Sequence, residues 1–405
     1  EKVEVMHGKH ICVAKQTLST MVLLYHWHRA FNLIFDQAHC DIYPFINVKE
    51  AVLKMQPLFV RQAFQNNTPL VSIIVMKIFY AVQATGNGHI ARASWLLPYL
   101  QNHGSVDLFL SGSNSTLNTG MDAKFKSKGV SLYYSSYGGL DYAKIFKSFN
   151  PLKLLKEAKA LPIQDYDIII NDFEPITALA CSLKKMASIG FGHQASFQSK
   201  LAPRPARKSM AGEWVLTQYA KATQYVGLHF KSYDHFICNP VLSTSMLNAQ
   251  PKDEQHITIY LSHYHDDIVM KHIEQLPDLH FHLFSKTEKG IRRYKNILLQ
   301  PVGASAFQQS MINCTGVITG AGFETPAEAL LLKKKLLCMP IKGQYEQWCN
   351  AAALKAFHVP ILPSIESDFS KEIANWINAP APDELILTKS VEEIVQDVIR
   401  LGMDV

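Results

Sequence analysis

The sequence predicts an α/β protein built from two doubly wound domains. From residue 76 onward, short buried strands alternate with amphipathic helices, a pattern typical of mostly parallel sheets. The alternation comes in two series, which are separated by a segment that contains Asn239 and Pro240. A chain of 405 residues, of which 48% are hydrophobic, is long enough to bury two cores.

The composition narrows the class of protein. The net charge is +6, but the chain lacks the dense lysine and arginine runs of nucleic-acid-binding proteins. The seven cysteines are widely spaced and form no C-x-x-C pair, which favours reduced thiols and a cytoplasmic location. Charged residues and histidines interrupt the most apolar stretches, 17–35 and 69–82, so we expect neither a membrane-spanning helix nor a signal peptide.

Residues 1–75 differ from the rest of the chain. Gly8 is their only glycine, and their apolar residues keep neither a helical nor a strand period. We therefore expect an atypical N-terminal extension, with Met76 as the natural start of the protein. A protein that begins at Met76 should then be folded and active.

The first domain is expected over residues 76–240. It opens with a strand at 77–81, a tight turn at 85–88 and a helix at 90–101, as doubly wound domains commonly do. Further strands are expected at 106–110, 130–134, 167–171 and 188–191.

The second domain is expected over residues 241–388, followed by a C-terminal helix within 389–405. This helix should pack back across the first domain. The strands of the second domain are expected at 257–261, 280–284, 297–299, 317–319 and 336–339.

A glycine turn followed by a helix is the most informative motif. Gly320 and Gly322 allow the backbone to approach a ligand, and Thr325 is expected to cap the helix. The first amides and the positive end of the helix would then bind a diphosphate. Glu328, one turn later, offers two oxygens to the two ribose hydroxyls. Taken alone, this segment fits an ordinary strand–turn–helix corner equally well.

A second polar cluster follows the strand at 336–339. Glu346 and Gln347 can exchange hydrogen bonds with sugar hydroxyls, and they lie at the carboxyl edge of the sheet, where ligands bind. Taken alone, this segment is better explained as the polar face of a helix start.

Together the two segments resemble the donor-binding region of GT-B glycosyltransferases. The resemblance is greatest to the group with the bacterial enzyme that adds N-acetylglucosamine to a lipid-linked muramyl peptide, and to related uncharacterised bacterial glycosyltransferases. The shared pattern is a glycine turn, T-x-x-E-A, a strand, a proline and a Gln-rich run that ends in Asn350 and Ala351. In layout the resemblance covers about residues 76–390. It implies two Rossmann-like domains facing a cleft, and the inverting, metal-independent transfer of a sugar from a nucleotide diphosphate, with uridine diphosphate expected and no cofactor.

The resemblance also implies the donor-binding residues. They are Gly320, Gly322, Phe323, Thr325, Glu328, Glu346, Gln347 and Ser262. Glu346 stands where the lipid-pathway enzyme has glutamine, so the donor sugar stays open.

Two candidate catalytic residues follow strands of the first domain. His89 lies in the turn after the first strand, and histidine is the residue type best suited to deprotonating an acceptor hydroxyl near neutral pH. Alternatively, His89 merely touches phosphate at a helix start. Asp172 could be the base itself or could orient His89. The acceptor-binding candidates are Gly86, Gly88, Glu174, His193 and Gln194.

The acceptor is a small molecule, a glycan or a lipid-linked compound. Lysines and apolar residues alternate between 144 and 159, which would allow peripheral contact with an anionic membrane. An ordinary surface helix is the preferred interpretation, because the lysines do not share one face.

Three other classes compete with a glycosyltransferase. A dehydrogenase would explain Gly86 and Gly88, but the strand at 106–110 lacks the acid that binds the adenine ribose. A binuclear metallohydrolase would explain the histidines and aspartates at 263–267, but Ile268 stands where its last histidine is needed, and we expect no metal. A non-catalytic nucleotide-sugar binding protein remains the principal alternative.

Overall fold

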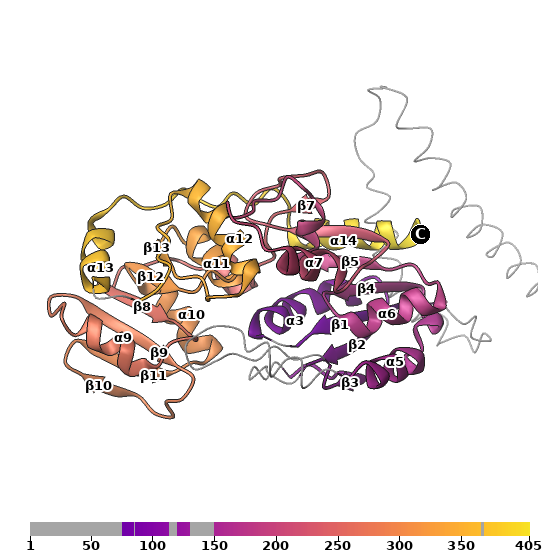
Figure 1. The fold of residues 1–405 in the computed structure, drawn as a ribbon, viewed down its shortest axis with the longest axis horizontal. Coiled ribbons are helices and arrows are strands. Elements are labelled where there is room, and N and C mark those ends of the chain that lie inside the picture. Colours follow the sequence, from indigo (N-terminus) through magenta and orange to yellow (C-terminus); the bar gives the residue numbers. More distant parts are fainter. Residues whose placement is uncertain (1–74, 85, 113–119, 130–149, 366–367) are drawn as a thin grey trace, which may run out of the picture. The chain divides into compact units, whose positions relative to one another are not determined.

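The computed structural model describes residues 75–84, 86–112, 120–129, 150–365 and 368–405. These residues belong to one compact unit that contains two β-sheets with helices packed against them (Figure 1). The expected extension up to residue 74, the expected strand at 130–134 and the basic stretch up to residue 149 lie outside the described residues.

The first sheet is parallel throughout its described strands, in the order β3-β2-β1-β4-β5-β6-β7. The order of the chain reverses between β1 and β4, so the carboxyl ends of these two strands border a crevice. The strands are β1 (Lys77–Gln83), β2 (Ser105–Ser111), β3 (Phe125–Ser127), β4 (Ile168–Asp172), β5 (Ile189–Gly192), β6 (Gln224–Leu228) and β7 (Ile237–Cys238). The helices of this part are α3 (Asn87–Gln101), α5 (Pro151–Ala160), α6 (Pro175–Lys184) and α7 (Met210–Gln218).

The second sheet has the order β10-β11-β9-β8-β12-β13 and is parallel except for the β10–β11 pair. Its chain order reverses at β8, which lies between β9 and β12. The strands are β8 (His256–Tyr260), β9 (His280–Ser285), β10 (Arg292–Tyr294), β11 (Ile297–Pro301), β12 (Gly316–Thr319) and β13 (Lys335–Cys338). The helices are α8 (Thr244–Leu247), α9 (Asp266–Ile273), α10 (Ala304–Asn313), α11 (Glu324–Leu331), α12 (Tyr345–Leu354) and α13 (Phe369–Asn378).

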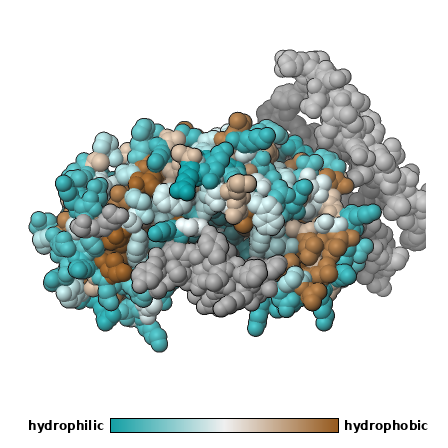
Figure 2. Space-filling model, in the orientation of Figure 1, coloured by the Kyte–Doolittle hydropathy of each residue, from teal (hydrophilic) through white to brown (hydrophobic). Residues whose placement is uncertain are grey.

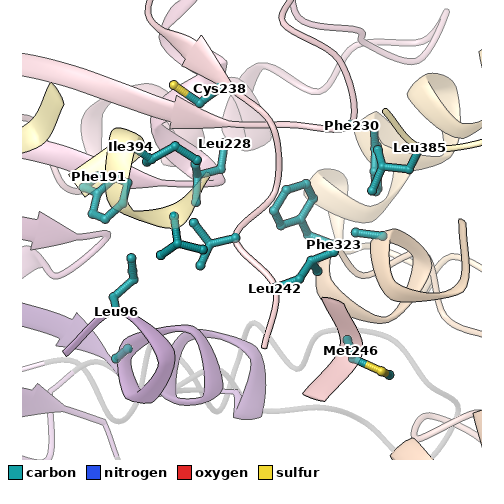
Figure 3. Packing of buried hydrophobic residues seen from close by; sticks show 14 of the residues in the cluster. Leu96, Phe191, Leu228, Phe230, Cys238, Leu242, Met246, Phe323, Leu385 and Ile394 are labelled. Carbon is teal, nitrogen blue, oxygen red and sulfur yellow. The ribbon is translucent and has the colours of Figure 1, made fainter. Parts of the chain in front are cut away.

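The C-terminal helix α14 (Val391–Met403) returns to the first sheet and contacts α3, β4, β5 and β6 (Figure 1). Its side chain Ile394 belongs to the same buried cluster as Phe191 and Leu228 of the first sheet (Figure 3). Asn239 holds the chain that leads into α14, because its Oδ1 accepts hydrogen bonds from the amides of Thr388 and Lys389. The C-terminal segment therefore completes the core of the first sheet.

The hydrophobic core continues from the first sheet to the glycine turn of the second. Phe230, which follows β6, packs against Phe323 with ring centroids 5.1 Å apart (Figure 3). Phe323 is 4% exposed and immediately precedes α11. Its burial anchors the glycine turn next to the first sheet.

The predicted α/β class with two doubly wound sheets is confirmed. Apart from the strand outside the described residues, each strand expected from the sequence is present. Five elements were not predicted from the sequence: β3, β6, β7, β10 and helix α7.

The surface in Figure 2 is mostly hydrophilic, with hydrophobic patches separated by polar side chains. None of the helices in the described part of the chain is long and apolar enough to cross a membrane.

Candidate functional site

The carboxyl ends of β1 and β4 bring His89 and Asp172 together. His89 is the third residue of α3, which follows β1, and Asp172 is the last residue of β4. The strands are neighbours, with Val82 paired to Asp172. Nδ1 of His89 lies 2.8 Å from Oδ1 of Asp172. This is the geometry of an imidazole oriented by a carboxylate.

A buried arginine, Arg92, completes this pair. It lies one helical turn after His89 and is 1% exposed. Its Nη2 donates to both carboxylate oxygens of Asp172 at 2.8 Å, and its Nε donates to one of them at 3.3 Å. Burial alone would raise the pKa of Asp172, but Arg92 and His89 outweigh it and hold the pKa below its ordinary value. Asp172 is therefore charged. This role of Arg92 was not predicted from the sequence.

Two unusual backbone conformations shape the surroundings of this pair. Gly192, at the end of β5, has φ 132°, and a Cβ there would lie 2.8 Å from Oδ1 of Asp172 and 3.1 Å from Nη2 of Arg92. Phe173 has φ 57°, and its ring lies parallel to that of His89 with centroids 6.5 Å apart. Position 192 therefore requires glycine, because Asp172 and Arg92 approach the backbone there and φ is positive.

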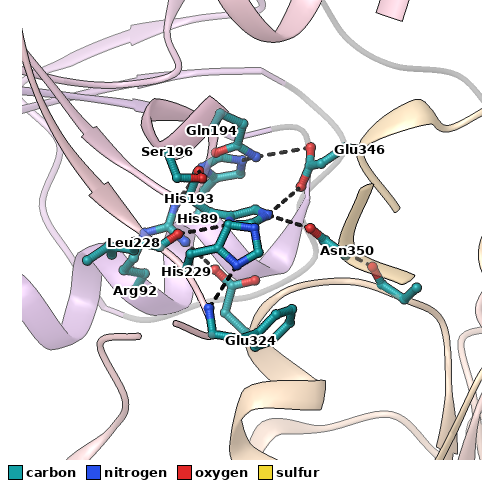
Figure 4. Close-up of polar contacts among 12 residues, drawn as sticks. His89, Arg92, His193, Gln194, Ser196, Leu228, His229, Glu324, Glu346 and Asn350 are labelled. Atoms are coloured by element: carbon teal, nitrogen blue, oxygen red, sulfur yellow. Dashed lines mark hydrogen bonds and ion pairs between the residues drawn. The ribbon is translucent and has the colours of Figure 1, made fainter. Parts of the chain in front are cut away.

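Gln194 connects the first sheet to the second. Its Nε2 donates to Oε2 of Glu346 at 3.1 Å and lies 3.3 Å from Nε2 of His89 (Figure 4). Glu346 is the second residue of α12. The residue expected to contact the donor sugar therefore lies close to the candidate base.

His193 occupies a structural position between the two sheets. Its Nδ1 lies 2.9 Å from the carbonyl oxygen of Leu228, and its Nε2 lies 2.7 Å from Oδ1 of Asn350 (Figure 4). Its ring stacks on Phe323 with centroids 4.0 Å apart. The side chain is 1% exposed, and burial lowers its pKa. Both ring nitrogens have partners within the protein, and acceptor contact at His193 stays a prediction.

Glu174 also has a structural position. It is the N-cap of α6, and its carboxylate accepts hydrogen bonds from the amides of Ile176 and Thr177 at 2.9 and 2.6 Å. The residue is fully buried, and burial raises its pKa. Helix capping uses this carboxylate, and the acceptor contact expected at Glu174 stays a prediction.

The glycine turn after β12 leads into α11, as the sequence predicts. A Cβ at Gly322 would meet nothing within 4 Å, so the backbone is open there. The helix begins at Glu324, with Phe323 at the N-cap and no side-chain cap. Thr325 is therefore the second residue of the helix, and the predicted N-cap at this position is wrong. The turn still presents the first amides of a helix, which lack partners inside the helix.

Glu328 lies one turn into α11 and is 5% exposed. Burial, with a smaller contribution from the neighbouring charge of Glu324, raises the pKa of Glu328 to about 8. Because burial disfavours the charged carboxylate, any hydrogen bond donated to it would stabilise the charged form of Glu328.

The remaining donor candidates lie at the carboxyl edge of the second sheet. Gln347 accepts a hydrogen bond from the amide of Ile341 at 2.9 Å. Its Oε1 would lie 3.4 Å from a Cβ at Gly320, which places it beside the glycine turn. Ser262 is exposed and follows β8, the strand next to β12.

Of the two glycines before His89, Gly88 faces the start of α11. Gly86 is the N-cap of α3. A Cβ at Gly88 would lie 2.6 Å from Oε2 of Glu324, so the first turns of α3 and α11 approach each other closely at Gly88. The acceptor contact expected at these glycines stays a prediction, and the close approach of the two helices was not predicted from the sequence.

The segment 263–267 stabilises a neighbouring loop. Oδ2 of Asp266 accepts hydrogen bonds from the hydroxyl of Ser285, which ends β9, and from that of Thr287, which follows the strand. In the described ranges, no three His, Cys, Asp or Glu side chains gather in a way that could hold a metal ion.

A cavity of about 2190 Å³ lies next to the candidate base. Its lining includes Phe173, which stacks on His89, and Glu346, which accepts from Gln194. Apolar side chains from α6, α7 and the residue that follows α7 form part of the lining, including Ala178, Leu179, Trp214, Leu216 and Tyr219. Basic side chains, among them Lys185 and Arg207, line it as well. Helix α7 was absent from the sequence predictions, so the part of the cavity that it lines could not be foreseen.

Comparison with known proteins identifies one family. Residues 76–371 match the family model described as Glycosyl transferase family 1. No match was found among curated protein sequences.

Solved structures share the fold of this chain. The structure of Arabidopsis thaliana UGT89C1 complexed with UDP has a TM-score of 0.52 and 12% identity, and the match covers 81% of this chain and 94% of that one. UGT89C1 complexed with quercetin gives a TM-score of 0.51 at 12% identity, with the same coverage. The glycotransferase of kitacinnamycin gives a TM-score of 0.51 at 11% identity, covering 82% of this chain and 96% of that one.

Proposed function

We propose that this chain, which belongs to glycosyl transferase family 1, transfers a sugar from a uridine diphosphate sugar to a hydroxyl group of a largely apolar acceptor. The family and the GT-B fold make the chain a glycosyltransferase. The proposal further concerns the nucleotide of the donor, the residues that bind the donor and catalyse the transfer, and the class of acceptor.

The donor would bind at the start of α11. The amides of residues 322–325 and the positive end of the helix suit a diphosphate, and the open backbone at Gly322 gives it access. Glu328 would accept hydrogen bonds from the ribose hydroxyls, and Glu346 and Gln347 would contact the sugar. UGT89C1, which has a similar fold, was crystallised with UDP, and this supports a uridine nucleotide.

His89 would act as the general base. Asp172 would hold its Nδ1 proton and stabilise the imidazolium that forms when Nε2 takes the proton of the acceptor hydroxyl. The deprotonated hydroxyl would attack the anomeric carbon from the face opposite the leaving diphosphate. A single displacement of this kind inverts the anomeric configuration, and it requires no metal ion.

The acceptor would lie in the cavity beside Phe173 and Glu346. The apolar lining from α6 and α7 favours an acceptor with a large apolar body and a hydroxyl group at one end. The complex of UGT89C1 with quercetin supports this class of acceptor.

The 2.8 Å contact between His89 and Asp172, beside a glycine turn that opens a helix, is the observation on which this proposal depends. Isothermal titration with UDP, ADP and NAD tests the donor site. UDP should bind best, and Glu328→Ala should weaken its binding by about tenfold, because two hydrogen bonds to the ribose are lost. If UDP fails to bind, or binds no better than NAD, the proposed function is wrong.

A further inference from the structure

Glu324 places a carboxylate at the entrance of the proposed diphosphate site. It is the first residue of α11, and its side chain is 20% exposed. One carboxylate oxygen, Oε1, accepts a hydrogen bond from Nη1 of Arg92. The other, Oε2, lies against Gly88 in the first turn of α3.

The position that this carboxylate occupies is suited to an anion. The first turns of α3 and α11 face it, and both helix starts carry a positive partial charge. The guanidinium of Arg92 adds a full positive charge that is 1% exposed to solvent. Gly88 leaves the space that any Cβ would take, since that atom would lie 2.6 Å from Oε2.

We infer that the carboxylate of Glu324 holds the place of one donor phosphate group, and that Arg92 binds this phosphate once the donor displaces Glu324. The inference rests on the proposed function and adds to it a phosphate ligand from the first sheet and a competing group in the protein itself.

Arg92 can make this exchange without releasing the catalytic pair. Its Nε and Nη2 face Asp172, whereas Nη1 alone faces Glu324. Donor binding would therefore replace one acceptor at Nη1 and leave the contacts to Asp172 in place. The same guanidinium would then touch both the partner of the base and the leaving diphosphate, where negative charge develops during the reaction.

Electrostatic repulsion gives the reason why Glu324 would move. Glu324 and Glu328 lie on the first two turns of α11, and the charge of Glu324 contributes to the raised pKa of Glu328. A diphosphate at this helix start would add further negative charge beside both groups. Because Glu324 is partly exposed, its side chain can turn toward solvent, whereas Arg92 is fixed by Asp172.

Calorimetric affinities for UDP and for uridine test the inference. Glu324→Gln removes the competing charge while keeping the size of the side chain. It should strengthen UDP binding by about tenfold, because Arg92 no longer has to give up an ion pair with Glu324 and the diphosphate no longer meets a negative charge there. Uridine has no phosphate, so its affinity should stay within about twofold. Arg92→Met and Arg92→Lys should both weaken UDP and leave uridine unchanged.

Glu346→Gln is the matched control, because it removes one negative charge from the same site but from the position proposed for the sugar, which UDP lacks. Melting temperatures of all variants establish that they are folded. The inference is overturned if Glu324→Gln changes UDP affinity no more than Glu346→Gln does, or if it strengthens uridine equally. If the wild-type protein binds neither UDP nor uridine, the proposed function fails instead.

Discussion

The amide nitrogen of Gln194 lies 3.3 Å from Nε2 of His89. The same nitrogen donates to Glu346, which fixes the amide with its hydrogens toward both groups. Nε2 of His89 thus accepts this hydrogen bond, and Nδ1 is the ring nitrogen that carries a hydrogen toward Asp172. This is the tautomer in which Nε2 can take a proton from a substrate. Nη2 of Arg92 lies 3.0 Å from the same Nδ1.

The tautomer predicts unequal effects on turnover and on donor binding. His89→Ala should lower the transfer rate by about 100-fold or more, because the general base is lost. Asp172→Asn should also lower the rate, because an amide cannot stabilise the imidazolium. UDP affinity should stay within about twofold in His89→Ala. Steady-state kinetics together with calorimetry measure both quantities, and an unchanged rate in His89→Ala would exclude the base role.

Gly192 provides a test of how the charged pair is accommodated. Gly192→Ala forces a Cβ to within 2.8 Å of Asp172 and places alanine at φ 132°. We expect a loss of about 2–4 kcal/mol in the free energy of unfolding, from backbone strain and steric overlap together. Urea denaturation measures the loss. At Gly290 a Cβ would meet nothing within 4 Å, so Gly290→Ala is a control expected to change stability by less than about 0.5 kcal/mol.

Glu328 should make stability depend on pH. Its pKa in the folded protein is raised to about 8, so between its ordinary pKa and pH 8 the folded state binds more protons than the unfolded state. The contribution of Glu328 to the free energy of unfolding should therefore be largest below about pH 5 and should fall as the pH rises toward 8. Glu328→Gln should remove this component. Melting temperatures of both proteins from pH 5 to 9 test it, and parallel curves would contradict it.

The cavity predicts an effect on acceptors alone. Ala178 lines the cavity from α6, so Ala178→Phe fills part of the proposed acceptor site. We expect the KM for an apolar acceptor to rise by about tenfold, whereas UDP affinity stays unchanged. Leu183→Phe on the same helix is the control, because Leu183 is exposed and does not line the cavity. Equal effects of both variants would argue against this site.

Strands with continuous apolar runs could be predicted from the sequence. β4 (Ile168–Asp172) is buried along its whole length, and three isoleucines at its start make it stand out. β6 was missed because it begins with an exposed glutamine and a tyrosine before its buried residues. α7 was missed because its apolar residues Met210, Trp214 and Val215 are exposed and mark no core-facing stripe.

The candidate site could be predicted only where one local pattern carries it. Asp172 ends a strand, and His89 and the turn at 320–322 come after strands, so topology alone places them at a sheet edge. Arg92 lies 80 residues from Asp172 and 232 from Glu324, and no local pattern shows that these carboxylates surround it. The spacing of three residues from His89 was the one available signal, because it puts both side chains on one helix face. The burial of His193 and Glu174 likewise depends on distant partners.

The most direct test of the whole account is an assay of UDP release. The wild-type protein and His89→Ala are each incubated with a panel of UDP-sugars and a hydroxylated aromatic acceptor. We expect the wild-type protein to release UDP and form a glycoside of inverted configuration with at least one sugar, and His89→Ala to bind UDP equally well but form no product above about 1% of that amount. A His89→Ala protein that forms the glycoside at the wild-type rate, or a product of retained configuration, would contradict it.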